Sequence, residues 1–330
     1  MSESNASNAP LSVDAGGSPV GEAARDPGGG RRRPLTDFFG RLLRQQPLGA
    51  AAGVVLLGLI FVAVFAEQLT PHEYDIGRVQ DRLQAPSAEH PLGTDHAGRD
   101  VLARILKGAQ VSLLVGLMAT LLNTIVALLV GGTTGFIGSR VDIYTQRFVD
   151  AWMSFPGLLL LLTIMSFVDR SIVTVIVVLG VTGGIPASRV VRGAVIGVKE
   201  NAYFQAAEAA GARRRRILVR HVLPNIAAPL IVIFSINVGS VIIAEASLSF
   251  LGFGLPVNVP SWGGMLSREG RRYMELAPRL ALWPGLFLTV TVYCLNMVGD
   301  AVRDLLDPRL RGTAGRYGGS TSRRRGVGTP

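Results

Sequence analysis

Long stretches without any charged side chain constrain this chain more than any other feature of its sequence. A helix needs about 20 apolar residues to cross the hydrocarbon core of a bilayer. Uncharged runs of about that length or more cover residues 45–66, 111–139, 151–168, 171–188, 222–244 and 280–299. They predict an all-α membrane protein with six transmembrane helices.

A seventh uncharged run, residues 246–267, differs from the others because it is rich in residues that break helices. Its glycines and prolines are Gly252, Gly254, Pro256, Pro260, Gly263 and Gly264. Irregular backbone would leave polar groups unsatisfied in lipid. We therefore expect a loop here, with residues 251–278 capping the outer side of the protein through short helices.

The amount and placement of charge also point to a bilayer. Only 17% of the residues are charged, against roughly 25% in soluble domains. The net charge of +10 would suggest nucleic acid as a partner of a soluble protein. With both termini in the cytoplasm, however, most of the 33 basic residues fall on inner segments, as the positive-inside rule requires. The lipid bilayer accounts for the charge, and no nucleic-acid partner is expected.

The runs and their flanks suggest the following organisation. We expect a disordered tail over 1–34, the first transmembrane helix within 35–66, an extracytoplasmic loop over 67–110, a core transmembrane domain over 111–305 and a cytoplasmic tail over 306–330. Arg104 and Lys107 lie on the side assigned to the exterior. The apolar face of residues 99–110 predicts an interfacial helix that carries them.

The inner segment 198–225 separates two hydrophobic runs and has the features of a docking element. Its small residues Ala202, Ala206, Ala207 and Ala210 share a helical stripe that ends at Gly211, the residue type that most readily closes a helix. Arg213, Arg214, Arg215, Arg216 and Arg220 then precede Pro224. A helix with small side chains on one face can approach another protein's backbone closely. Arginines beside it can bind carboxylates or lipid phosphates.

The outer loop contains HPLGTDHAGRD at residues 90–100, whose Gly, Pro, Thr and Asp suit tight turns. His90, Asp95 and His96 could ligate a metal, but nothing in their spacing fixes a ligand geometry. We interpret the segment as a structured turn and expect no metal site. The single cysteine, Cys294, allows neither an intramolecular disulfide nor a cysteine metal cluster.

Polar side chains within the hydrophobic runs are candidates for a transport pathway. Glu245 directly follows the fifth run, and an ionised side chain at membrane depth must face protein or water. It either lies on a pathway or gate, or is held at the outer interface for structure only. Asn237 and Asn296, like Asn123, either line a pore or form hydrogen bonds between helices.

Four glycines in the second run predict close helix packing. Gly131, Gly132, Gly135 and Gly138 give this run an edge of small residues at helical spacing.

Several segments together resemble the inner-membrane permeases of ABC importers, of the dipeptide, oligopeptide and nickel type. The inner segment is similar to the EAA loop of that family in Gln205-Ala206-Ala207, Gly211 and the ending His221-Val222-Leu223-Pro224, although Gln205 stands where glutamate is common. The 90–100 motif resembles the signature of the second permease of these systems. Further matches are RFVDAWMSFP (147–156), AEASLSFLGFG (244–254), SWG (261–263) and GDAVRDLLDPR (299–309). The resemblance covers nearly the whole chain between residues 35 and 309.

This resemblance implies a type I ABC importer permease fold, with one extra N-terminal helix before a five-helix core. It implies a bacterial cytoplasmic (inner) membrane protein with both termini cytoplasmic, which imports di- or oligopeptides, with nickel, haem or glutathione as alternatives. The implied partners are a second homologous permease, two ATPase subunits or one fused ATPase, and an extracytoplasmic substrate-binding protein. The implied coupling residues are Gln205, Ala206, Ala207, Gly211, Arg213, Arg216, Leu223 and Pro224. ATP and Mg²⁺ would be bound by the ATPase subunits, so no cofactor is expected in this chain.

Two other classes of protein compete with this interpretation. An ion-coupled secondary transporter would also have six spans, but the sequence shows neither a repeated half nor paired broken helices. An enzyme within the membrane would need catalytic residues, and the sequence contains no HExxH, GxSxG or phosphate-binding GxxxxGK[ST] motif. We therefore expect a chain without catalytic residues whose ATP is hydrolysed by separate subunits.

Overall fold

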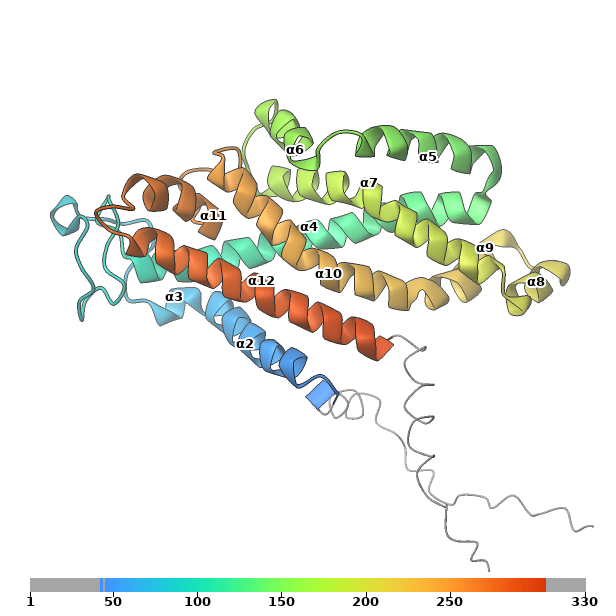
Figure 1. Ribbon diagram of the computed structural model, residues 1–330, viewed down its shortest axis with the longest axis horizontal. Coiled ribbons are helices and arrows are strands. Elements are labelled where there is room, and N and C mark those ends of the chain that lie inside the picture. Colours follow the sequence, from blue (N-terminus) through green and yellow to red (C-terminus); the bar gives the residue numbers. More distant parts are fainter. Residues whose placement is uncertain (1–41, 44, 307–330) are drawn as a thin grey trace, which may run out of the picture.

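The computed structural model describes residues 42–43 and 45–306, and these are mostly helical (Figure 1). The tail expected at 1–34 and all but the first residue of the tail expected at 306–330 lie outside the described residues, and Leu306 ends α12. The α-helices are α2 (Pro47–Val64), α3 (Ala66–Leu69), α4 (Val101–Ile137), α5 (Ser139–Met153), α6 (Gly157–Ser166), α7 (Ile172–Lys199), α8 (Ala202–Ala209), α9 (Arg214–Ile217), α10 (Leu223–Phe250), α11 (Trp262–Met265) and α12 (Arg279–Leu306). A 3₁₀ turn, η1 (Val79–Asp81), and two π-helical turns, η2 (Leu218–Val222) and η3 (Leu266–Gly270), complete the set.

Five helices of the described part are long and apolar enough to cross a membrane. They are α2, α4, α7, the continuous helix from Arg214 to Phe250 that contains α10, and α12. A bent pair, α5 and α6, adds a sixth span if the two are counted together. The predicted all-α membrane fold is therefore confirmed, and each of the six runs predicted to span lies mainly in one of these elements.

The third predicted span, residues 151–168, differs from expectation because it is not one straight helix. Its first residues belong to α5, α6 is only 10 residues long, and the two axes meet at 87°. The break lies at Pro156, which disfavours a helical conformation in the residue before it. Polar contacts also hold α5 against α7: Arg192 forms two hydrogen bonds of 2.5 Å to Asp142.

The second predicted span begins earlier than its uncharged run. Residues 101–110 are the first turns of α4 and do not form a separate interfacial helix. The side chain of Asp100 accepts a 2.7 Å hydrogen bond from the backbone N–H of Ala103 and so caps the helix. Arg104 is buried within the protein, so its charge is matched by protein groups and not by the membrane interface.

The loop expected at 246–267 also begins later than predicted. Residues 246–250 continue α10, because the first helix-breaking residue after them is Gly252, which has a positive φ of 85°. The short helices α11 and η3 follow within 251–278, as the sequence suggested.

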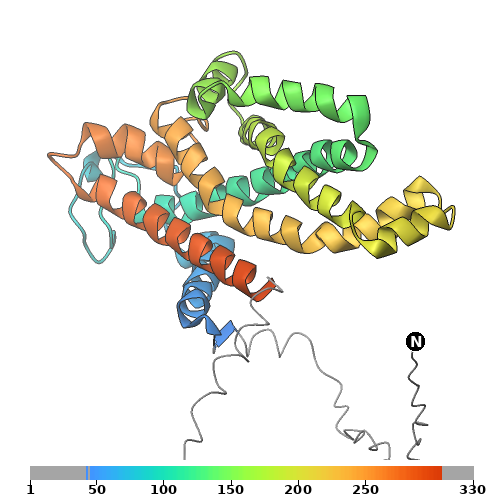
Figure 2. The same cartoon turned by 45° about the vertical axis from the view of Figure 1, so that its right-hand side comes forward.

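The helices form a bundle in which α4 and α7 make the most extensive pair. In both views α2 lies beside α12 at one edge, and α5 and α6 lie at the opposite edge (Figures 1 and 2). The short helices α8 and α9 lie at one end of the bundle, whereas α11 and the loop before α4 lie at the other (Figure 1). The predicted docking segment and the capped end, which contains α11, thus lie at opposite ends of the bundle.

Glycines allow α4 and α7 to approach closely. A Cβ atom on Gly131 would collide with the carbonyl oxygen of Ser188 and lie 2.9 Å from the nitrogen of Arg192, and one on Gly135 would lie 3.0 Å from the carbonyl oxygen of Arg192. These two glycines fulfil the predicted role in helix packing. Gly132 does not, because a Cβ there would meet only the side chain of Leu128, within the same helix.

This difference makes neighbouring glycines of α4 a matched pair for mutation. We expect Gly131→Ala to destabilise the protein, because overpacking against backbone costs about 1–3 kcal/mol. Gly132→Ala should be neutral or slightly stabilising, since alanine is favoured over glycine by about 1 kcal/mol in a helix. Thermal unfolding of the two variants in detergent measures the difference, and equal midpoints would show that α4 and α7 are not packed as described.

Candidate functional site

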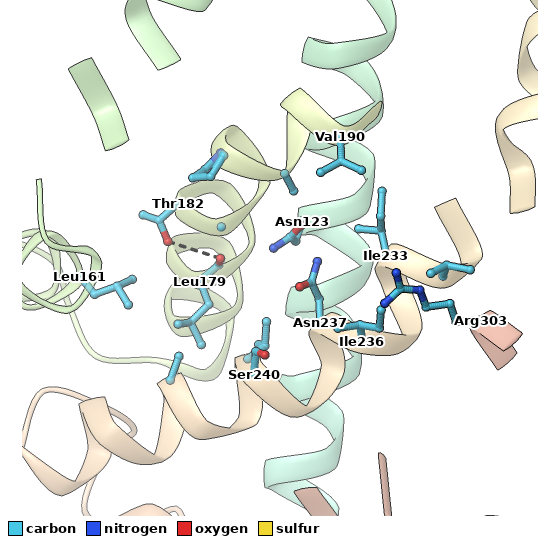
Figure 3. Close-up of a pocket in the computed structure, with 16 residues that line it drawn as sticks. Asn123, Leu161, Leu179, Thr182, Val190, Ile233, Ile236, Asn237, Ser240 and Arg303 are labelled. Carbon is cyan, nitrogen blue, oxygen red and sulfur yellow. Dashed lines mark hydrogen bonds between the residues drawn. The ribbon is translucent and has the colours of Figure 1, made fainter. Parts of the chain in front are cut away.

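An open cavity of about 610 Å³ lies among α4, α6, α7, α10 and α12, at the level of the hydrophobic runs (Figure 3). Most of its wall is aliphatic. Its polar side chains are Asn123, Thr182, Asn237, Ser240 and Arg303. A mainly apolar hollow with a few polar groups is typical of sites that bind small molecules.

The structure brings only one of the three predicted pathway residues to this cavity. Asn237 lines it, and Figure 3 shows its side chain pointing into the same space as that of Asn123. Asn296 lies over Gly239 instead, where a Cβ would come 2.7 Å from its Oδ1. Glu245 does not line the cavity.

Other lining residues were missed or undervalued by sequence reasoning. Asn123 was expected either to line a pore or to form hydrogen bonds between helices, and the structure places it at the cavity wall. Its Oδ1 is buried and has no hydrogen-bond partner within the described ranges. Arg303 follows the last uncharged run and was not among the predicted site residues, but α12 extends far enough to place it at the cavity.

Glu245 is fully buried near the capped end of the bundle. Its Oε1 accepts a 2.7 Å hydrogen bond from the Ser249 hydroxyl, one turn further along α10. The adjacent Ala246 backbone is packed so closely against Gly263 that a Cβ on that glycine would collide with it. This environment, buried and bonded within its own helix at the contact of α10 with α11, favours a structural role.

We therefore expect Glu245→Gln to retain substrate uptake close to the wild-type rate, because the amide oxygen can still accept the bond from Ser249. Glu245→Leu should lower stability, because it removes the acceptor of the buried Ser249 hydroxyl at a cost of about 1–3 kcal/mol. Uptake assays and thermal unfolding of both variants test this. Loss of uptake in a stable Glu245→Gln protein would return Glu245 to the pathway.

The predicted docking segment forms a short helix closed by Gly211. Gly211 has φ +72°, and its N–H donates to the carbonyl of Glu208 at 2.9 Å. The N–H of Ala212 donates to the carbonyl of Ala207 at 3.1 Å. This pair of bonds is the Schellman motif, which requires a left-handed residue after the helix and explains the glycine.

One face of α8 is anchored to the bundle and the other is exposed. Phe204 is buried in a cluster with Val198, Ile217, Val222 and Ile226, and Ala207 and Leu223 pack against the same cluster. The exposed residues include Ala202, Gln205, Ala206 and Ala209. Of the predicted coupling residues, Gln205, Ala206, Gly211, Arg213, Arg216 and Pro224 are exposed, whereas Ala207 and Leu223 are partly buried.

The docking segment is joined to the cavity through one continuous helix. The turn η2 links α9 to α10, with the N–H of Leu223 donating to Leu218 five residues back. This wide turn immediately precedes Pro224, whose ring would otherwise clash with a carbonyl of a regular helix. The helix therefore runs unbroken from Arg214 to Phe250 and carries both the exposed arginines and Asn237.

The metal ligands considered at 90–100 do not converge on one point. Nδ1 of His90 lies 2.8 Å from Oδ2 of Asp100. The Asp95 carboxylate accepts from Arg99 Nε at 2.7 Å and from two backbone N–H groups of its own turn. The motif builds a turn, as its composition predicted, and it also caps α4 through Asp100.

These features are those of a membrane permease. Helices of membrane length enclose an open cavity, and a short exposed helix is joined to one of the spans. The chain belongs to the family of inner membrane components of binding-protein-dependent transport systems, whose model matches residues 123–312. Residues 34–86 match the N-terminal transmembrane domain of oligopeptide transport permease C. The chain is thus a multi-pass permease of an ABC importer in the inner membrane, and such permeases are not themselves the catalytic subunits.

Curated relatives cover most of the chain. It is 37% identical to the glutathione transport system permease GsiD of Pectobacterium atrosepticum, over 85% of this chain and 93% of that protein. It is 35% identical to the dipeptide transport system permease DppC of Alkalihalophilus pseudofirmus, over 84% and 91%. It is 32% identical to the oligopeptide transport system permease OppC of Bacillus subtilis, over 81% and 88%.

The fold also resembles a solved importer. A chain of the inward-facing MetNI methionine ABC transporter superposes with a TM-score of 0.51 at 18% identity, over 62% of this chain and 96% of that one. This likeness supports the type I permease fold expected from the sequence.

Proposed function

We propose that this permease imports di- or oligopeptides, glutathione-like peptides included, and forms half of the translocation pathway with a second homologous permease. The cavity carries the proposal, because carboxamide and hydroxyl groups lie on an otherwise aliphatic wall, with Arg303 at one side. Amides can bond a peptide backbone, and a guanidinium can pair with its carboxylate. The named substrates of the relatives support the same class of solute. Nickel is a weaker candidate, since this wall offers neither histidine nor carboxylate ligands.

Family membership implies ATPase and substrate-binding partners, and we propose that α8 is the contact for the ATPases. Two ATPase subunits, or one fused chain, would bind ATP and Mg²⁺ and press on the exposed face of α8. The unbroken helix from Arg214 to Phe250 would carry that displacement to Asn237 and the cavity. In this arrangement both termini and α8 face the cytoplasm, and α11 and the loop before α4 face the substrate-binding protein.

Reconstitution into proteoliposomes tests the proposal against ion-coupled transport. The complete complex, with its binding protein outside and ATP inside, should accumulate labelled dipeptide only when ATP is hydrolysed. Dissipating the proton and sodium gradients should leave uptake unchanged. Uptake that persists without ATP and stops with an ionophore would show a secondary transporter instead.

A further inference from the structure

A second cluster of potential ligands lies in the loop before α4, away from the cavity and the docking helix. His72, Glu89 and His90 each offer one potential ligand atom, and these three atoms all lie within 4.8 Å of one another. The rings of His72 and His90 have centroids 4.8 Å apart. The residues border a small hollow of about 190 Å³. From this geometry we propose that the loop binds a divalent transition-metal ion of the Zn²⁺ class.

A carboxylate holds the buried histidine in place. The side chain of His90 is 8% exposed, and its Nδ1 donates to the Asp100 carboxylate, which is 3% exposed and 2.8 Å away. A carboxylate acceptor at Nδ1 places the ring proton there and leaves the lone pair on Nε2. Within the part of the chain that the structure describes, the His90 ring bonds a side chain through Nδ1, and His90 lines the hollow. Carboxylate–histidine–metal pairs of this kind fix the ring and raise its basicity.

Charge and size favour a small cation. The hollow is lined by more acidic than basic side chains. The acidic residues are Glu73, Asp81, Glu89 and Asp100, and the basic one is Arg78. Two imidazoles and a carboxylate are a common ligand set for zinc, with a water in the fourth position. In such a site the ligand atoms are about 3.3 Å apart, whereas here they lie up to 4.8 Å apart. Binding therefore requires His72 and Glu89 to move closer to His90. Both can do so, because Glu89 is exposed and His72 is half-buried.

The neighbouring cluster of Asp95, His96 and Glu269 is the poorer site. Arg99 lies 2.7 Å from Asp95 and 3.2 Å from Glu269, and Arg104 lies 3.2 Å from Glu269. These guanidinium groups neutralise both carboxylates and would repel a divalent cation. His96 therefore provides a control in the same loop.

Zinc retention by the purified full-length chain tests the proposal, with an affinity tag that contains no histidine. After chelator treatment and dialysis against micromolar Zn²⁺, we expect about one bound ion per chain. His72→Ala should lose it, and His96→Ala should keep it. Failure of the wild-type chain to retain zinc, equal retention by both variants, or loss only in His96→Ala would overturn the proposal.

Asp100→Asn tests the role of the supporting carboxylate without removing the helix cap, since asparagine caps as well as aspartate. Its amide can donate to Nδ1 of His90, which moves the ring proton to Nε2 and blocks the ligand atom. We expect zinc affinity to fall about 10–100-fold while the far-ultraviolet circular dichroism stays unchanged. Unaltered affinity in a folded Asp100→Asn protein would contradict the assigned geometry.

Discussion

A permease carrying Ala206→Arg should fold and reach the membrane but fail to retain its ATPase subunits, and ATP-driven uptake should be lost. Ala206 lies on the exposed face of α8, whereas the helix is held to the bundle by Phe204 on its other face. A long side chain at Ala206 would therefore hold a partner away without disturbing the permease. Loss of a central contact costs at least about 2 kcal/mol, or about 30-fold in affinity. Co-purification of the ATPase and uptake of labelled dipeptide measure the effect.

The matched control is Ala206→Ser, which keeps the side chain small and should preserve both assembly and uptake. Ala207 and Gly211 are poorer probes. Ala207 packs against the buried cluster, so a charge there would damage the fold, and Gly211 has a positive φ that strains any other residue. Recovery of the Ala206→Arg complex at wild-type yield would show that the ATPases bind elsewhere.

Features encoded by neighbouring residues were predictable from the sequence. Uncharged runs located the spans because burial in lipid selects each helix by its own length and polarity. The turn after α8 was also predictable, since both hydrogen bonds that close it join residues within 207–212. Even so, the functional assignment of that turn came from resemblance, because no local rule distinguishes a docking helix from any exposed helix.

Features that join distant segments were not predictable. Arg104 was predicted to lie at the membrane interface. The sequence could not show that Glu269 neutralises it, because the two residues are 165 positions apart. The cavity was hidden for the same reason, since Asn123 and Asn237 meet only after α4 and α10 pack together. Pro156 alone predicts part of the bend between α5 and α6, because it disfavours helix in the residue before it. The bonds of Arg192 to Asp142, which hold α5 along α7, span 50 residues.

The Arg104–Glu269 contact is also where we expect the largest loss of stability from a single substitution. Glu269, in η3, accepts from Nη2 of Arg99 and of Arg104, each at 3.2 Å. The side chains of Arg104 and Glu269 are 1% and 3% exposed. Glu269→Ala leaves Arg104 buried with only Asp95, whose Oδ2 is 3.5 Å from its Nε. Breaking a buried pair on one side costs about 3–5 kcal/mol, so the unfolding midpoint of the purified permease should fall markedly.

A second ion pair on the same helix shows why burial, and not the number of salt bridges, decides the outcome. Lys107 Nζ lies 2.8 Å from Glu67 Oε1, and this hydrogen bond lowers the pKa of the Glu67 carboxyl. Because Glu67 is 70% exposed, water replaces the lost contact, and Glu67→Ala should leave the midpoint close to wild type. The double variant Arg104→Met with Glu269→Met should recover much of the loss, because no unpaired charge then remains buried between them. Equal midpoints for Glu269→Ala and Glu67→Ala would mean that water reaches Arg104, and the cap formed by η3 over the start of α4 would then be open.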